Sequence, residues 1–438
     1  MSVTPDIIAS LVLQEYEKLP VKRKPPVRDN GLHEWVPLSG IVAELRGGSD
    51  LRCLSLATGM KCLPHAKLPL ARGNVLHDWH AEVLAIRAFN RFVLDECKVL
   101  AEGGPDAESL FLRRRRVDEL QERQATTPWC GQPFIWREDV KLHMYCSEAP
   151  CGDASMELTM AAQADATPWE TPSPIATSPK TSEADPAPAP ATLPGRAFFQ
   201  HLGVVRRKPA RGDAPATLSK SCSDKLALRQ CTSLLSSTAS LLVSPTNAYL
   251  ATLILPASQY SATGCERAFS SRMATMKNQM PEQENQHAGG YRFVPFRVDT
   301  TDLEFAYSRR GVASRLSREG TAATGSSADK MAASNLAVAW TAGGLEEASL
   351  GGTLQGRKLF DPRGASFASR RKMWALAVET AAMLGAGLVG LKKTLAAQNY
   401  KELKQSELLQ PRTDVKNKAV STALKGWVEN DGDNDFSL

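Results

Sequence analysis

Three short sequences carry residue types that bind metal ions and move protons. They are DWHAEVL at 78–84, EAPCGDAS at 148–155 and KSCSDKLA at 220–227. In the first, His80 stands two residues before Glu82, so an imidazole and a carboxylate lie close together along the chain. Cys151 and Cys222 supply sulfur in the other two, and imidazole with thiolate is a ligand set typical of zinc. Taken together, the three sequences predict a zinc site.

The size of this ligand set indicates a catalytic zinc site. One His and two Cys leave the fourth tetrahedral position open for water, whereas a structural site uses four protein ligands. Zinc lowers the pKa of such a water, and a carboxylate that does not bind the metal accepts the proton and later delivers it. Glu82 is the candidate for this role. The remaining cysteines have no such neighbours and are interpreted as structural; they are Cys53, Cys62, Cys97, Cys130, Cys146, Cys231 and Cys265.

Apolar patterns predict the elements that position these residues. Residues 80–100 have the apolar stripe of an amphipathic helix, whose first turn would hold His80 and Glu82. Residues 141–147 alternate like a half-buried strand and lead to a helix predicted from Pro150, so Cys151 would lie at a helix N-terminus that stabilises its thiolate. Other predicted helices are 5–16, 370–384 and 391–408, and other predicted strands are 34–45, 51–62, 248–255 and 335–343.

The composition is that of a globular α/β protein. The chain has 438 residues, of which 42% are hydrophobic and 23% charged, and its net charge of +6 is only a mild bias toward polyanions. Alternating strands and helices without an internal repeat predict one domain over residues 1–438, with a mixed sheet flanked by helices. The Pro-, Ala-, Thr- and Ser-rich residues 164–195 predict a disordered insertion, and residues 309–334 a second, low-complexity insertion.

Several features predict an intracellular protein, nuclear or cytoplasmic, without a membrane span. The N-terminus lacks the basic start and apolar run of a signal peptide. The most apolar long stretch, 374–391, contains Glu379 and three glycines, and it predicts a buried helix. Nine cysteines at irregular spacing do not suggest a disulfide framework. No obligate protein partner is indicated.

The sequences HAE, PCGDAS and SCSDK, in this order, resemble the catalytic domain of the adenosine deaminases that act on RNA, and especially those that act on tRNA. The resemblance runs from EWVPLSGIV to the C-terminal GWVENDGDNDFSL. It implies a cytidine-deaminase-like fold, zinc bound by His80, Cys151 and Cys222, and Glu82 as the proton shuttle. Many zinc deaminases have a second cysteine three residues after the first; here that residue is Ala154, so Cys222 takes its place.

The resemblance also implies a substrate. It favours tRNA, because the chain begins almost directly at the domain, without room for the double-stranded-RNA-binding modules of the mRNA-editing relatives. The branch that this chain resembles converts adenosine to inosine 3′ of the anticodon in alanine tRNA. Two alternatives stay open: a deaminase that edits duplex RNA or another base, and a non-catalytic RNA-binding scaffold that keeps the fold and the metal. The presence of Glu82 argues against the scaffold.

A second ligand implied by the resemblance is inositol hexakisphosphate, held inside the domain. Lysines and arginines buried together repel one another unless an anion neutralises them. The positions that match the family's binding residues are Lys61, Arg87, Ser219, Lys225, Ser237, Tyr400, Lys404, Trp427, Glu429 and Asp435. The chain departs from the pattern where editing relatives carry Asn, Arg, Arg and Lys; the residues here are His77, Ile86, Leu228 and Asn430.

The basic segment VVRRKPARGDAP at 204–215, just before Cys222, is the candidate RNA contact. The resemblance aligns it with the loop that fills the space left by the flipped base, which would place Asp213 near that nucleotide. The candidates for phosphate contacts are Arg206, Arg207, Lys208 and Arg211. Met60 is expected to border the pocket. The alternative is an exposed basic loop or a nuclear-import sequence.

Overall fold

A computed structural model describes most of the chain. The described residues are 3–48, 50–121, 129, 131–162, 193–194, 201–208, 214–280, 289–318, 330–385 and 387–438. The helices are α1 Pro5–Glu17, α2 Leu68–Ala71, α3 Ala81–Glu102, α4 Val117–Gln121, α5 Met156–Ala161, α6 Cys222–Thr232, α7 Ala239–Leu242, α8 Ala262–Cys265, α9 Ala274–Gln279, α10 Arg309–Arg318, α11 Arg370–Met383, α12 Val389–Leu395, α13 Tyr400–Lys404 and α14 Gln410–Thr422.

The strands form one large sheet and three small ones. They are β1 His33–Trp35, β2 Leu38–Leu45, β3 Asp50–Thr58, β4 Leu112–Arg114, β5 Phe134–Trp136, β6 Lys141–Cys146, β7 Leu193–Pro194, β8 Arg206–Arg207, β9 Val243–Ser244, β10 Leu250–Pro256, β11 Arg297–Thr301, β12 Met331–Ala333, β13 Leu336–Thr341, β14 Glu346–Leu350 and β15 Thr353–Leu354.

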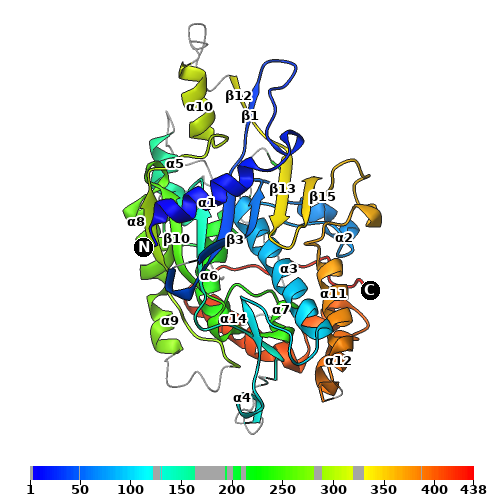
Figure 1. The fold of residues 1–438 in the computed structure, drawn as a ribbon. Coiled ribbons are helices and arrows are strands. Elements are labelled where there is room, and N and C mark those ends of the chain that lie inside the picture. The colour runs from blue at the N-terminus through cyan, green and yellow to red at the C-terminus, as the bar shows by residue number, and fades with distance from the viewer. Residues whose placement is uncertain are drawn as a thin grey trace, which may run out of the picture.

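The large sheet has eight strands in the order β11-β10-β6-β2-β3-β13-β14-β15. Of these, β10, β3, β13 and β15 are labelled in Figure 1. Strands β11, β10 and β6 are parallel to one another, and the pairs from β6 to β15 are antiparallel. The carboxyl ends of β6, β10 and β11 therefore lie at one edge of the sheet. The prediction of a mixed sheet flanked by helices is confirmed.

Both faces of the sheet are covered, which explains why every residue of β2 is buried. Alternate side chains of the strand point to opposite faces. Ile41 and Ala43 belong to the apolar cluster that contains the buried residues of α3, whereas Leu38 and Val42 pack with those of α1. The helix α11 packs on α3, so the α3 side of the sheet holds the larger part of the core. This larger core positions the site described below.

The elements differ from the predicted ones at several places. The strand predicted at 34–45 is divided into β1, which pairs with β12, and β2, which belongs to the large sheet. After Pro150 the chain forms a 3-10 turn at Asp153–Ser155, and α5 begins only at Met156. The helix predicted at 391–408 is interrupted, because the Asn399 side chain accepts the backbone N–H of Glu402 (2.9 Å) and so starts α13 as a separate helix. The segment 309–334, predicted to be a low-complexity insertion, begins with α10 and contains β12 near its end, and residues 319–329 between them lie outside the described residues.

Other sequence features fall partly or wholly outside the described residues. Of the predicted disordered insertion at 164–195, only β7 is described. Within the described part of the chain, no helix is long and apolar enough to cross a membrane. The prediction of a buried helix over 374–391 holds only in part. Trp374, Leu376 and Ala377 are buried in α11, but this helix ends at Met383, and the stretch continues into α12, whose first residue Val389 is exposed.

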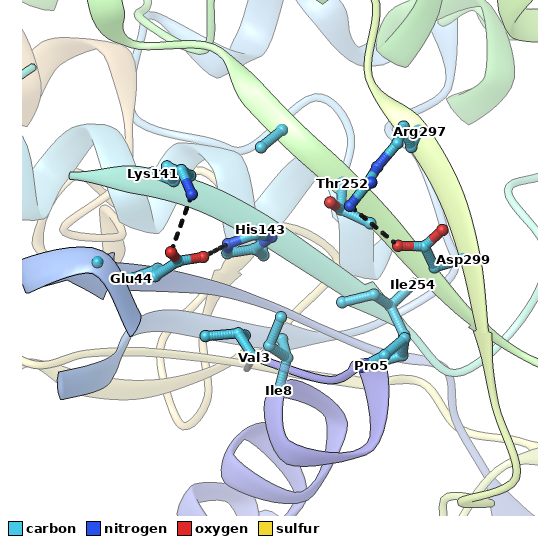
Figure 2. A pocket seen from close by; sticks show the side chains of 12 residues that line it. Val3, Pro5, Ile8, Glu44, Lys141, His143, Thr252, Ile254, Arg297 and Asp299 are labelled. Carbon is cyan, nitrogen blue, oxygen red and sulfur yellow. Dashed lines mark hydrogen bonds and ion pairs between the residues drawn. The ribbon is translucent and has the colours of Figure 1, made fainter. Parts of the chain in front are cut away.

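A cavity of about 530 Å³ lies where α1 meets the amino ends of β6 and β11 (Figure 2). Its charged side chains neutralise one another. Lys141 pairs with Glu44 (3.0 Å), and Arg297 pairs with Asp299 (3.5 Å). His143 also contacts Glu44, at 3.0 Å. This edge of the sheet is opposite to the one described next.

Candidate active site

The structure brings together the three residues that the sequence assigns to zinc. One ligand atom from each of His80, Cys151 and Cys222 lies within 4.8 Å of the other two, and the Cys151 Sγ is 3.8 Å from the His80 Nδ1. Three soft or borderline ligands at such distances fit a single zinc ion with an open position. The residues therefore suit the metal that the resemblance implies.

The start of α3 fixes His80. It is the N-cap residue of the helix, with an extended backbone, and its own N–H donates to the Asp78 carboxylate (3.0 Å). The N–H of Ala81 donates to the carbonyl of Gly59 (2.8 Å), which ties this turn to the end of β3. The predicted helix thus forms as expected, with His80 just before it and Glu82 in its first turn.

The start of α6 fixes the two cysteines. Cys222 is the first residue of α6, and the Ser221 side chain caps the helix by accepting the N–H of Asp224 (3.1 Å). The backbone N–H of Cys222 donates to the Cys151 Sγ (3.3 Å). A helix N-terminus therefore faces the Cys151 sulfur, as predicted, but it belongs to α6; the expectation that Cys151 begins its own helix was wrong.

Close packing holds the Cys151 loop against α6. Gly152 has a φ of +102°, and a Cβ at this position would lie 2.3 Å from the Ser221 Oγ. Ser223 joins the same segments, because its N–H donates to the Cys151 carbonyl (3.0 Å) and its hydroxyl donates to the Pro150 carbonyl (2.9 Å). Only glycine fits this position without moving the two sulfur atoms apart.

The pKa values of the two thiols are shifted in opposite directions. A hydrogen bond from Cys222 lowers the pKa of Cys151 well below the usual range of a thiol. Burial, followed by the interaction with Cys151, raises the pKa of Cys222. Zinc binds two thiolates, so binding of the metal releases the proton that lies between the two sulfurs.

Glu82 is buried next to these ligands, at 6% exposure. Burial raises the pKa of its carboxyl, and the negative charge of Cys151 raises it further. A carboxyl with a raised pKa holds and releases a proton closer to neutral pH, as general acid–base chemistry requires. The environment of Glu82 therefore suits a proton shuttle.

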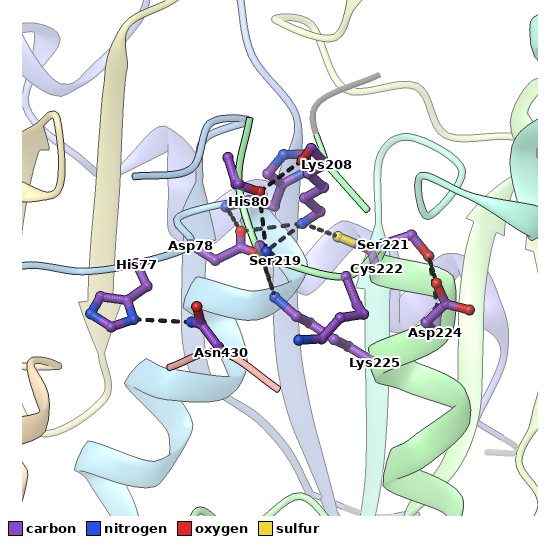
Figure 3. A network of polar contacts seen from close by, with 12 residues as sticks. His77, Asp78, His80, Lys208, Ser219, Ser221, Cys222, Asp224, Lys225 and Asn430 are labelled. Carbon is purple, nitrogen blue, oxygen red and sulfur yellow. Dashed lines mark hydrogen bonds and ion pairs between the residues drawn. The ribbon is translucent and has the colours of Figure 1, made fainter. Parts of the chain in front are cut away.

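Asp78 is the centre of a buried polar network (Figure 3). Its carboxylate accepts hydrogen bonds from Lys208 (2.9 Å), Ser219 and Lys225. Burial alone would raise the pKa of Asp78, but the ammonium groups of Lys208 and Lys225 hold it well below its usual range. Sequence reasoning missed Asp78, although it stands two residues before His80 in the first of the three sequences.

Lys208 also contacts the candidate zinc site. Its Nζ donates to the Cys222 Sγ (3.2 Å), and the residue is only 5% exposed. The interpretation of Lys208 as a phosphate contact was wrong, because its ammonium group is buried between Asp78 and a thiol. Arg206 is likewise 1% exposed, so it does not reach a phosphate either. In a basic loop, the sequence alone does not distinguish these buried charges from exposed ones.

The other predicted RNA contacts have different positions. Arg207 and Met60 are half-buried, and Met60 packs against the apolar cluster beneath α1. Arg211 and Asp213 lie outside the described residues. The structure therefore leaves Arg207 and Met60 as candidates only.

Cys62, interpreted as structural, lies beside this site. With Asp78 and His80 it forms a second group whose ligand atoms lie within 4.8 Å of one another. Asp78 already accepts several hydrogen bonds, so its oxygens are less available to a metal than the Cys151 and Cys222 sulfurs. The second group is therefore a poorer metal site than the first.

Basic side chains from distant segments gather on the other side of Lys225. We call them the cation cluster: Arg87, Lys220, Lys225, Arg229, Arg370, Lys404, Arg412 and Lys416. Burial, then repulsion from neighbouring cations of the cluster, lowers the pKa of Arg87 to about 10, of Arg229 to about 9 and of Lys404 to about 7. The cluster is thus destabilised by its own charge unless an anion is present.

Most residues matched to the inositol phosphate ligand touch this cluster. Ser237 accepts a hydrogen bond from Lys404 (3.2 Å), and Glu429 pairs with Lys416 (2.8 Å). The remaining ring and hydroxyl contacts pair Lys220 with the Trp427 ring, Arg370 with the Tyr400 ring and Lys225 with the Ser219 hydroxyl.

Two of the matched residues lie elsewhere. Lys61 is exposed and donates to Asn335 at the start of β13. Asp435 is exposed, whereas Asp433, which sequence reasoning missed, is buried and contacts His77 (2.6 Å). Along this irregular C-terminal segment, no periodic pattern indicates which acidic residue faces inward.

Known proteins resemble this chain over most of its length. The family described as the adenosine-deaminase (editase) domain matches residues 55–431. The tRNA-specific adenosine deaminase 1 of Schizosaccharomyces pombe is 36% identical over 307 residues, which are 69% of this chain and 70% of the relative. The Saccharomyces cerevisiae protein of the same name is 36% identical over 230 residues, which are 52% of this chain and 52% of the relative. The double-stranded RNA-specific editase Adar of Drosophila melanogaster is 28% identical over 119 residues, 27% of this chain and 15% of its own. The chain therefore belongs to the adenosine-deaminase (editase) family of enzymes.

Proposed function

We propose that this enzyme is a zinc-dependent tRNA deaminase that converts adenosine to inosine 3′ of the anticodon in alanine tRNA. The observation that carries the proposal is the convergence of His80, Cys151 and Cys222 within 4.8 Å, at the start of the helix that holds Glu82. The names of the Schizosaccharomyces pombe and Saccharomyces cerevisiae relatives support tRNA as the substrate. The position and the tRNA species follow from the resemblance of the sequence.

His80, Cys151 and Cys222 would hold the zinc ion, which when bound supplies a water molecule activated at neutral pH. The Glu82 carboxylate would take a proton from the attacking water and deliver it to N1 of adenine. It would then pass the proton of the hydroxyl newly formed on C6 to the amino group, which leaves as ammonia when its bond to C6 breaks. Asp78 and Lys208 position the site, since Asp78 binds the His80 backbone and Lys208 binds the Cys222 sulfur.

The cation cluster supports inositol hexakisphosphate as a second, structural ligand. The Lys404 Nζ donates to the Ser237 hydroxyl (3.2 Å), and desolvation together with the charges of Arg412 and Lys416 lowers its pKa to about 7. A polyphosphate there would neutralise the cluster and stabilise only the folded state. Asp78 would connect the two ligands, because it binds both Lys225 of the cluster and Lys208 of the zinc site.

The test is an inosine assay on purified, zinc-loaded protein. We expect inosine in alanine tRNA, and little in other tRNAs or in long duplex RNA. Activity on duplex RNA but not on tRNA would favour the editing alternative. Zinc-loaded protein that forms inosine in none of these RNAs would contradict the proposal and favour the scaffold.

A further inference from the structure

Helix α10 has four arginines and no acidic residue. They are Arg309, Arg310, Arg315 and Arg318. The buried Val312 and Leu316 attach the helix to the domain. Arg315 is half-buried, and the other three arginines are exposed. Among the described residues only Arg310 of the four forms an ion pair, with Glu304 at 3.3 Å. The helix therefore presents a positive surface that the described protein neutralises only in part.

A cavity of about 560 Å³ lies beside this surface. Its walls are α10 and the segments at the carboxyl ends of β10 and β11. Three of the α10 arginines line it, and the acidic residues in its lining are Asp302 and Glu304. The Arg315 guanidinium lies over the Tyr307 ring, 5.8 Å from its centroid, so this side chain is held in place. The cavity therefore has an excess of fixed positive charge.

The cavity lies at the same edge of the sheet as the candidate zinc site. Strand β6 is parallel to β10 and ends at Cys146, shortly before Cys151. The Glu148 carboxylate accepts the backbone N–H of Arg309 (3.0 Å), so α10 begins beside the loop that carries Cys151. Ligands of open α/β sheets bind outside the carboxyl ends of the strands. A substrate that reaches Cys151 therefore passes close to α10, which extends from one end of the molecule (Figure 1).

The cavity at the opposite edge of the sheet has similar size but different charge (Figure 2). There Lys141 and Arg297 both pair with acidic residues of the same cavity. Size alone therefore does not distinguish the two cavities. They differ in their charge and in their distance from Cys151, because the cavity beside α10 has excess positive charge and lies close to this residue.

From these observations we infer that the α10 arginines bind backbone phosphates of the RNA substrate next to the reacting adenosine. This inference rests on the proposed function. Guanidinium groups bind phosphates through two parallel hydrogen bonds, and such contacts position an RNA without reading its sequence. Two of the N-terminal N–H groups of the helix are already used, because Glu148 binds that of Arg309 and the Ser308 hydroxyl binds that of Gly311 (2.9 Å). The side chains therefore provide the binding.

The test exchanges Arg310, Arg315 and Arg318 together for glutamine in the full chain. The dissociation constant of the tRNA is measured by fluorescence anisotropy over a series of salt concentrations. We expect about tenfold weaker binding or more at low salt, and a slope of log affinity against log salt that is smaller by about 2. The matched control is Arg297→Gln, whose side chain is 79% exposed at the other end of β11, and it should change neither quantity.

A second variant guards against a folding defect. The double exchange Arg309→Gln and Arg318→Gln alters only exposed side chains, and we expect it to reduce both affinity and slope by a smaller amount, about 1 in the slope. Zinc content and melting temperature should stay unchanged. If the unaltered protein binds tRNA and both variants bind it equally well, the inference is overturned. If the unaltered protein binds no tRNA, the proposed function and the inference fail together.

Discussion

Glu82 differs from the other carboxylates of α3 by its position beside three candidate zinc ligands. We expect Glu82→Gln to lower kcat by a factor of about 10² to 10⁴ while zinc stays bound, because glutamine has a similar shape but transfers no proton. Inosine formation and zinc content by metal analysis check this.

The matched control for Glu82 is Glu96→Gln on the same helix. Burial raises the pKa of Glu96 as well, and its carboxylate accepts a hydrogen bond from Ser109. At the usual rise per residue of a helix, Glu96 lies about 20 Å from Glu82 along α3. This variant should keep its activity. Turnover in the Glu82 variant at the rate of the unaltered protein would exclude Glu82 as the shuttle.

The packing of the Cys151 loop on helix α6 determines how the Cys151 and Cys222 sulfurs lie relative to each other. We expect Gly152→Ala to lower zinc affinity, activity and melting temperature together, because its Cβ would lie 2.3 Å from the Ser221 Oγ and push the loop off the helix. Zinc titration with a competing chelator measures the first effect. Adding zinc in excess should restore part of the melting temperature.

Gly104→Ala separates this steric effect from backbone strain. Gly104 also has a positive φ, of +73°, but nothing lies within 4 Å of its added Cβ. In that variant, the left-handed backbone conformation of a non-glycine residue should lower the free energy of unfolding by about 1–2 kcal/mol. The variant should bind zinc normally. Equal zinc affinity in the two variants would show that the close approach at Gly152 does not position the ligands.

The cation cluster acts on the stability of the whole molecule. In the empty protein, burial and the charges of Arg412, Lys416 and Arg370 lower the pKa of Lys404 to about 7 from 10.5. The unfolded chain then binds more protons than the folded one between these pH values, so this lysine makes the empty protein less stable as pH falls through that window.

Inositol hexakisphosphate should reverse this effect. A bound polyanion raises the pKa of Lys404, so binding at pH 8 should take up protons, and at pH 6 the uptake should largely disappear. Calorimetry in buffers of different ionisation enthalpy measures the uptake, and thermal melts should show a higher melting temperature with the ligand. The neighbouring Lys401→Met is the control, because Lys401 does not belong to the cation cluster, whereas Lys404→Met should reduce the uptake. Binding without proton uptake at pH 8 would contradict this account.

The sequence by itself determined the ligand types, the spacing of His80 and Glu82 in one helical turn, and the mixed sheet with its helices. These features depend on local periodicity and on neighbours along the chain, which a sequence displays directly. The sequence KSCSDKLA also offered Cys222 as the third ligand, because Ala154 stands where many zinc deaminases carry their second cysteine, and the resemblance to a known family agreed with this assignment.

Only the tertiary structure decided which charges are buried. Lys208 meets Asp78 across 130 positions of the chain, and this contact places a residue from a basic loop beside the candidate zinc site. Tertiary structure also decided that the N-terminus of α6 faces the Cys151 sulfur, and that Asp433 is buried while Asp435 is exposed. A charged side chain is stable inside a protein only beside a partner, and the partners here come from segments that no local pattern connects.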